Sequence, residues 1–165
     1  MIYYTDFNSL IGKIFVAKTE KGVCRIGLPG ETEEALFGWL QRYFPGENQM
    51  KSDDVLSPAK TDLEHYFAGK LTKFSFPLDL RTTSFRRKVL EEVCNIPYGQ
   101  TASYKEIAER IGNPSACRAV GGANASNPLP IVIPCHRVIA HDGSLGGYGS
   151  GLNLKAQLLQ LEGIL

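Results

Sequence analysis

The chain has 165 residues, of which 43% are hydrophobic and 21% are charged, and its formal net charge is +1. These values are ordinary for a soluble globular protein that is large enough to bury a real core. Residues 1–13 lack the basic and apolar regions of a signal peptide, and no apolar run approaches the ~20 residues that span a bilayer. We therefore expect a cytoplasmic protein, or a nuclear one in a eukaryote, with no membrane partner.

The cysteines argue against two further classes of protein. Four are present, without any C-x-x-C spacing: Cys24, Cys94, Cys117 and Cys135. Scattered thiols in a reducing compartment predict neither a disulfide framework nor a zinc site.

The first half of the chain is predicted to be a small α/β unit. Residues 11–19 and 22–29 are two apolar-rich runs on either side of TEKG, which indicates a β-hairpin. Residues 32–44 have apolar side chains at helical spacing, and a second helix is expected to start at Ser57. Residues 71–84 are expected to form a strand and a crossing linker, so the domain boundary is placed near residue 80.

The second half is predicted to be mostly helical and is more basic. It holds 9 Lys+Arg against 6 Asp+Glu, whereas residues 1–80 hold 9 against 11, which is a weak indication of a polyanionic partner. An amphipathic helix spans residues 84–96, and a capping box of Ser103 and Glu106 starts the next one, which Gly112 ends. Asn113 is expected to cap a third helix. The last two helices suggest a helix-turn-helix, which serves either core packing or DNA binding.

The third of these helices is unusually thin. It contains mainly Ala and Gly, and each interior glycine costs ~1 kcal/mol relative to alanine, so the Gly121-Gly122 pair needs a reason. One reason is close packing against another helix. The other is close approach to DNA, where small residues suit the narrow minor groove and where Arg118 is the one long side chain. The second reason predicts a protein that binds many sequences and projects one arginine into the duplex.

The segment IVIPCHRV, residues 131–138, places a thiol beside a base. A cysteine in an apolar strand is usually structural. Neighbouring side chains of a strand also point to opposite faces, so contact between Cys135 and His136 would require a turn or an intervening water. Pro134 makes an irregular backbone plausible. Glu162, in the C-terminal helix, is a candidate to orient the second ring nitrogen of the histidine.

IPCHRV, together with RAVGGANASNP before it and GYGSGLNLKAQLLQLEG after it, closely resembles the O6-alkylguanine-DNA alkyltransferase family. The resemblance is strong over residues 84–163 and weaker before them. It implies an α/β (α+β) fold. A ribonuclease H-like domain with an antiparallel hairpin would span residues 1–80, and a mostly helical winged helix-turn-helix domain would span residues 81–165.

The resemblance also implies a direct-reversal DNA repair reaction without a cofactor. The alkyl group on O6 of guanine, and on O4 of alkylthymine, would pass irreversibly to Cys135, so that the protein is consumed. His136 would remove the thiol proton through a water molecule, and Glu162 would orient His136. Asn127 would stabilise the turn that brings these groups together.

The implied partner is double-stranded DNA carrying O6-alkylguanine, bound by a monomer through the minor groove with low sequence specificity. Arg118 would fill the space that the flipped nucleotide leaves, and Tyr104 would turn the phosphate and meet the base. The family's phosphate contacts fall on Arg86, Ser103 and Lys105. Its alkylguanine pocket falls on the backbone carbonyls of Cys135 and Val138 and on Tyr148, Gly149 and Ser150.

Two departures from the family and two alternative functions follow from the same residues. Some relatives carry an N-terminal zinc site, but Cys24 is the only cysteine before residue 94, so no structural metal is predicted. Ser150 stands where the family commonly has glycine, and it is expected to crowd a benzyl adduct. The alternatives are a DNA-binding regulator or damage sensor that does not complete the transfer, and a thiol hydrolase.

Overall fold

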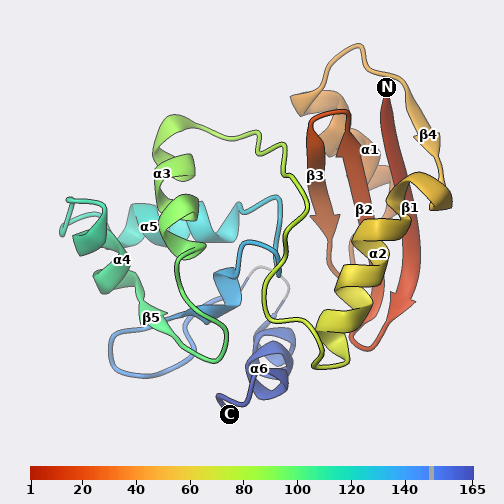
Figure 1. The fold of residues 1–165 in the computed structure, drawn as a ribbon. Coiled ribbons are helices and arrows are strands. Elements are labelled where there is room, and N and C mark those ends of the chain that lie inside the picture. The colour runs from red at the N-terminus through yellow and green to blue at the C-terminus, as the bar shows by residue number, and fades with distance from the viewer. Residues whose placement is uncertain (149–150) are drawn as a thin grey trace. The chain divides into compact units, whose positions relative to one another are not determined.

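The structure, a computed structural model, describes residues 1–148 and 151–165 (Figure 1). The chain divides into two compact units, Met1–Arg81 and Thr82–Leu165, one residue away from the boundary expected near residue 80. Within the described residues, no helix combines the length and the apolar character needed to cross a membrane.

The first unit is built on a four-stranded sheet in the order β3-β2-β1-β4. β2 (Gly12–Thr19) and β3 (Gly22–Gly27) form the antiparallel hairpin that the TEKG turn predicts. Two further strands were not predicted from the sequence. They are β1 (Ile2–Ser9), which pairs antiparallel with β2, and β4 (Gln49–Lys51), which runs parallel to β1.

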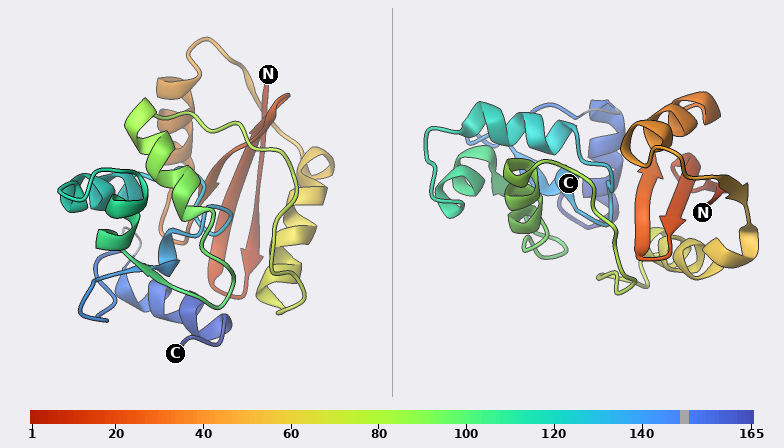
Figure 2. Two further views of the ribbon diagram at one scale, coloured as in Figure 1. Left: turned by 60° about the vertical axis from the view of Figure 1, so that its left-hand side comes forward. Right: turned by 90° about the horizontal axis from the view of Figure 1, so that it is seen from above.

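Two helices cover the two faces of this sheet (Figure 2). Phe15 and Ala17 of β2 pack in one cluster with Leu36 and Leu40 of α1 (Glu33–Tyr43). Because side chains alternate along a strand, the buried neighbours of Phe15 and Ala17 point to the other face, where α2 (Asp53–Phe67) lies. The sheet is therefore buried on both sides.

Two predictions for this unit were wrong. The second helix begins at Asp53 rather than at Ser57, because Ser52 caps it by accepting from Val55 N at 3.3 Å and two aspartates fill its first turn. Residues 71–83 contain no strand of their own, and the only pairing there is a single bridge between Leu78 and Val23.

The second unit packs its helices around a short 3-10 turn. α3 and α4 both contact α5, and η1 contacts both α3 and α6. β5 and β6 form a two-stranded parallel sheet. The elements are α3 (Ser84–Val93), β5 (Ala102–Ser103), α4 (Tyr104–Arg110), α5 (Cys117–Ala125), η1 (Cys135–Arg137), β6 (Val138–Ile139) and α6 (Leu152–Leu161).

The helix-turn-helix of α4 and α5 differs from the prediction at its turn. Ser103 caps α4 as expected, with its hydroxyl oxygen accepting from Glu106 N at 3.0 Å, and Gly112 follows the helix at a φ of 78°. Asn113 does not cap α5, because its carbonyl oxygen accepts from Ala116 N at 3.0 Å in a separate turn. With Asn113 as the cap, Pro114 would be the first helical residue, whereas the third helix begins at Cys117, three residues later.

Candidate active site

The loop before the candidate nucleophile is held by one buried side chain. Asn127 donates from Nδ2 to the carbonyl oxygen of Ile133 at 2.9 Å, and its Oδ1 accepts from Leu129 N at 2.9 Å. Between these two points Ile131 has a φ of 74°, which is a strained conformation for a β-branched residue. Asn127 thus bridges both ends of a strained turn that leads directly into Cys135.

Cys135 begins the 3-10 turn η1 and does not lie in a strand, contrary to the simplest interpretation of its apolar neighbours. The thiol is buried, with Sγ 3.9 Å from Tyr148 Oη. Burial raises the pKa of Cys135, against the opposing effects of hydrogen bonds from Asn127 and Tyr148 and of the charge on Lys155. The resting group is therefore a protonated thiol that needs a base before it can act as a nucleophile.

His136 is fully buried beside Glu162, with 2.6 Å between Nε2 and Oε2. Burial lowers the pKa of His136, although the adjacent Glu162 carboxylate opposes this effect. The imidazole is therefore neutral at physiological pH. Because the carboxylate can only accept, Nε2 carries the proton and Nδ1 is the basic nitrogen.

Arg137, which was not among the residues predicted for the site, completes the cluster. Its Nε donates to Glu162 Oε1 at 2.7 Å, its Nη2 donates to Oε2 at 3.1 Å, and its Nη1 donates to the carbonyl oxygen of Ile96 at 2.8 Å. Gly99 N also donates to Glu162 Oε1, at 3.1 Å. The carboxylate that faces His136 is thus fixed by a two-point ion pair and by the backbone.

Lys155 is a second buried cation that sequence reasoning missed. Its Nζ donates to the carbonyl oxygens of Val138 at 2.6 Å, Gly147 at 3.3 Å and Leu145. Burial lowers the pKa of Lys155 to about 8, although the nearby Cys135 opposes this shift. The sequence held one indication that Lys155 is buried. It stands one residue after Leu154 and three before Leu158, which places it on the buried side of α6.

The predicted pocket residues meet near this lysine. Tyr104 donates from its hydroxyl to the carbonyl oxygen of Gly147 at 3.2 Å, and Lys155 Nζ lies 5.8 Å and 6.0 Å from the ring centres of Tyr104 and Tyr148. The Val138 carbonyl accepts from Lys155. Gly149 and Ser150 lie outside the described residues, so the expected effect of Ser150 on benzyl adducts stays a prediction.

The predicted DNA contacts lie largely on exposed surfaces. Arg118 and Gly122 are on the exposed side of α5, and Lys105 is exposed on α4. Arg86 is half-buried, and the Ser103 hydroxyl is engaged as the cap of α4.

The two glycines of α5 are not explained by packing inside the chain. A Cβ atom added to Gly121 or Gly122 would meet no described atom within 4 Å, and neither residue has a positive φ. Close helix–helix packing is therefore the wrong explanation. The absence of side chains leaves a thin, open helix face.

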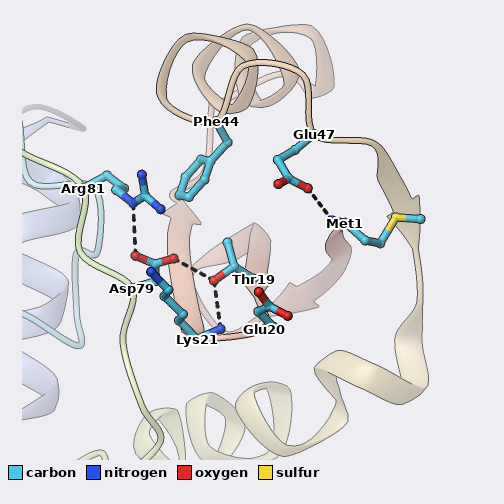
Figure 3. A pocket seen from close by; sticks show the side chains of 8 residues that line it. All are labelled: Met1, Thr19, Glu20, Lys21, Phe44, Glu47, Asp79 and Arg81. Carbon is cyan, nitrogen blue, oxygen red and sulfur yellow. Dashed lines mark hydrogen bonds and ion pairs between the residues drawn. The ribbon is translucent and has the colours of Figure 1, made fainter.

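A separate pocket in the first unit offers no comparable chemistry (Figure 3). Asp79 accepts from Thr19 Oγ1 at 2.7 Å and from Arg81 Nε at 3.2 Å, and the N-terminal ammonium pairs with Glu47. The charges drawn there are thus largely paired with one another. The lining residues are Met1, Thr19, Glu20, Lys21, Phe44, Glu47, Asp79 and Arg81.

Among the described residues, His, Cys, Asp and Glu side chains nowhere gather in threes as a metal site would require.

Comparison with known proteins covers nearly the whole chain. Residues 2–80 match the 6-O-methylguanine DNA methyltransferase ribonuclease-like domain, and residues 84–164 match the DNA binding domain of the same family. The inducible methylated-DNA–protein-cysteine methyltransferase of Bacillus subtilis is 40% identical, over 98% of this chain and 88% of its own length. The methylated-DNA–protein-cysteine methyltransferase of Methanosarcina barkeri is 44% identical, over 98% of this chain and 97% of its own length.

A solved structure gives the same result. The crystal structure of Mycobacterium tuberculosis OGT in complex with DNA has a TM-score of 0.85 and 40% identity, and the match covers 97% of this chain and 92% of that one. These matches confirm the α/β fold with a ribonuclease-like first domain and a helical second domain. The chain belongs to the 6-O-methylguanine DNA methyltransferase family, as the residues around PCHR predict.

Proposed function

We propose that this protein repairs DNA by moving the alkyl group of O6-alkylguanine, and of O4-alkylthymine, onto Cys135 in one irreversible step. The observation that carries the proposal is the buried thiol of Cys135, which directly precedes a buried His136–Glu162 pair. The curated relatives named as methylated-DNA–protein-cysteine methyltransferases support it.

The reaction needs the thiolate, which the buried site does not favour at rest. His136 takes the thiol proton on Nδ1 through a water molecule, and the Glu162 carboxylate stabilises the imidazolium that forms. The Lys155 ammonium and the Tyr148 hydroxyl lower the pKa of the Cys135 thiol and so favour the thiolate. The sulfur then attacks the alkyl carbon, the carbon–O6 bond breaks, and the base leaves with the bonding electron pair and is protonated.

Intact mass after incubation with duplex DNA containing O6-methylguanine tests this proposal. We expect each protein molecule to gain the mass of one methylene group once, and the gain to map to the Cys135 peptide. Tight DNA binding with no change in mass would instead indicate a damage sensor. Repeated turnover would indicate a thiol hydrolase.

We also propose that α5 enters the minor groove of DNA as the reading element of a monomer with low sequence specificity. The open face that Gly121 and Gly122 leave supports this proposal, because the helix backbone can approach the groove more closely than it could with larger side chains at these positions. Since O6 of guanine faces the major groove, the nucleotide must then rotate out of the stack to reach Cys135.

Gly122→Ala is expected to change the stability of the protein and its affinity for DNA in opposite directions. Because the added methyl group meets open space, the helix should gain up to ~1 kcal/mol in stability. On the exposed face the same methyl group should hold α5 away from the groove and weaken duplex binding. The matched control is Gly121→Ala on the half-buried side, which should gain similar stability with a smaller loss of affinity. Equal affinities for both variants and the unchanged protein, in a fluorescence anisotropy titration, would remove α5 from the interface.

Arg118→Ala tests the role of the exposed arginine in holding the flipped state. Repair of O6-methylguanine in duplex DNA should slow much more than reaction with free O6-benzylguanine, which needs no base flipping. Lys105→Ala, on the neighbouring helix, provides a control for the loss of one exposed positive charge and should mainly weaken binding in a salt-dependent way. If Arg118→Ala slows both substrates equally, the arginine acts on the pocket or on the fold.

A further inference from the structure

The loop Ile96–Gly99, between α3 and β5, holds both members of the buried ion pair behind the catalytic base. Gly99 N donates to Glu162 Oε1 at 3.1 Å, and the carbonyl oxygen of Ile96 accepts from Arg137 Nη1 at 2.8 Å. Gly99 has a φ of 79°, so a residue with a side chain would be strained at this point. The loop therefore fixes the ion pair through two main-chain contacts.

Tyr98 is the half-buried residue of this loop that contacts the same ion pair. Its ring centre lies 5.6 Å from Arg137 Cζ, within the range of a cation–π contact, and its hydroxyl donates to the carbonyl oxygen of Leu161 at 3.4 Å. The side chain of Arg137 is only 7% exposed, and that of Glu162 is fully buried. Because Tyr98 itself retains exposed surface, its ring lies between the ion pair and the solvent.

Water at this ion pair would change the properties of the catalytic base. Burial is the main cause that lowers the pKa of His136, the charges of Arg137 and Lys155 lower it further, and the Glu162 carboxylate raises it. Electrostatic effects of this kind are stronger where water is excluded. The neutral imidazole therefore depends on a dry environment around Glu162.

We propose that Tyr98 is a positioning residue, which keeps water from the Arg137–Glu162 pair and so holds Glu162 on His136 in the state that takes the thiol proton. The inference rests on the proposed function and deepens it, because it names a residue that acts on the base without touching the substrate. The aromatic ring is the part of Tyr98 that covers Arg137. The hydroxyl adds only a long hydrogen bond to the end of α6.

Tyr98→Leu, which removes the ring, tests this inference by NMR titration of the His136 imidazole in the protein without DNA. Water admitted to the ion pair relieves the effect of burial. His136 should therefore take up its proton at a higher pH than in the unchanged protein, by about half a pH unit or more. Tyr98→Phe keeps the ring and should titrate as the unchanged protein does. The chain has three histidines, so His65→Gln and His141→Gln identify the resonance.

The rate of methyl transfer from O6-methylguanine duplex gives a second measurement, made in a single turnover at saturating protein. Because the neutral imidazole is the base, the rate at about pH 6 relative to that at about pH 8 should be about threefold lower or more in Tyr98→Leu. A loss of stability alone would reduce the amount of active protein and would leave this ratio unchanged.

Tyr43→Leu is the matched control, because Arg42 Cζ also lies 5.6 Å from the ring centre of Tyr43, in the first unit. It removes the same kind of contact outside the site and should change neither the titration nor the rate ratio. If Tyr98→Leu does not fold, Tyr98→Met takes its place, since its longer side chain fills more of the space. An unchanged titration and an unchanged rate ratio in the folded variant would overturn this inference alone. No transfer by the unchanged protein would overturn the proposed function instead.

Discussion

Cys135→Ser is expected to abolish alkyl transfer while affinity for duplex DNA stays close to that of the unchanged protein. A serine hydroxyl is far less acidic than a thiol, and the neutral imidazole of His136 is too weak a base to ionise it. Burial already raises the pKa of the thiol, and it would oppose an alkoxide more strongly. With only 4% of its surface exposed, Cys135 adds little to any DNA-binding surface.

The measurements are intact mass after incubation with O6-methylguanine duplex and affinity for the same duplex. Cys94→Ser and Cys117→Ser are the controls, because both thiols are more accessible than Cys135 and neither belongs to the buried cluster. Both control variants should still gain one methylene group on Cys135. A gain of mass in Cys135→Ser, or a label on the Cys94 or Cys117 peptide, would show that accessibility rather than the site selects the sulfur.

Local sequence patterns predicted much of the fold because they act over a few residues. The hairpin of β2 and β3, helices α1 and α4 and the C-terminal helix α6 follow from apolar periodicity and capping residues. β1 was missed because its inward and outward residues do not alternate clearly, with half-buried Tyr3 and Tyr4 adjacent. The start of α5 was misplaced because Asn113 and Pro114 favour a turn as much as a helix start.

The site divides in the same way between local and tertiary determinants. The adjacency of Cys135 and His136 is visible in the sequence, and the family resemblance names Glu162. Arg137 and Lys155 could not be chosen, because burial of a charge depends on partners that are distant in the chain. Arg137 meets Glu162 across 25 positions, and Lys155 meets the Val138 carbonyl across 17. The residues next to Arg137 and Lys155 in the sequence indicate where each lies on its secondary-structure element, but not which distant group each one binds.

Arg137→Met is expected to destabilise the second unit by about 3–5 kcal/mol, because it leaves the buried Glu162 carboxylate without its cationic partner. The paired variant Arg137→Met/Glu162→Gln carries neither charge and should recover part of the loss. Urea unfolding followed by far-UV circular dichroism measures the change. Trp39, the single tryptophan, lies in the first unit, so its fluorescence reports whether that unit is altered. A loss below about 1 kcal/mol would show that the backbone and His136 suffice to hold the carboxylate.

The same variant should also change how stability depends on pH. Burial is the main cause that lowers the pKa of His136, and the positive charge of Arg137 lowers it further. In the unchanged protein, as the pH falls, the unfolded chain therefore takes up a proton at His136 at a higher pH than the folded protein does. The stability held above the ordinary pKa of about 6.5 is consequently lost as pH falls. Without Arg137 the pKa of His136 rises, so acid removes less stability. The difference in unfolding free energy between the two proteins should then narrow below about pH 6.5, and a constant difference would mean that Arg137 does not act on the imidazole.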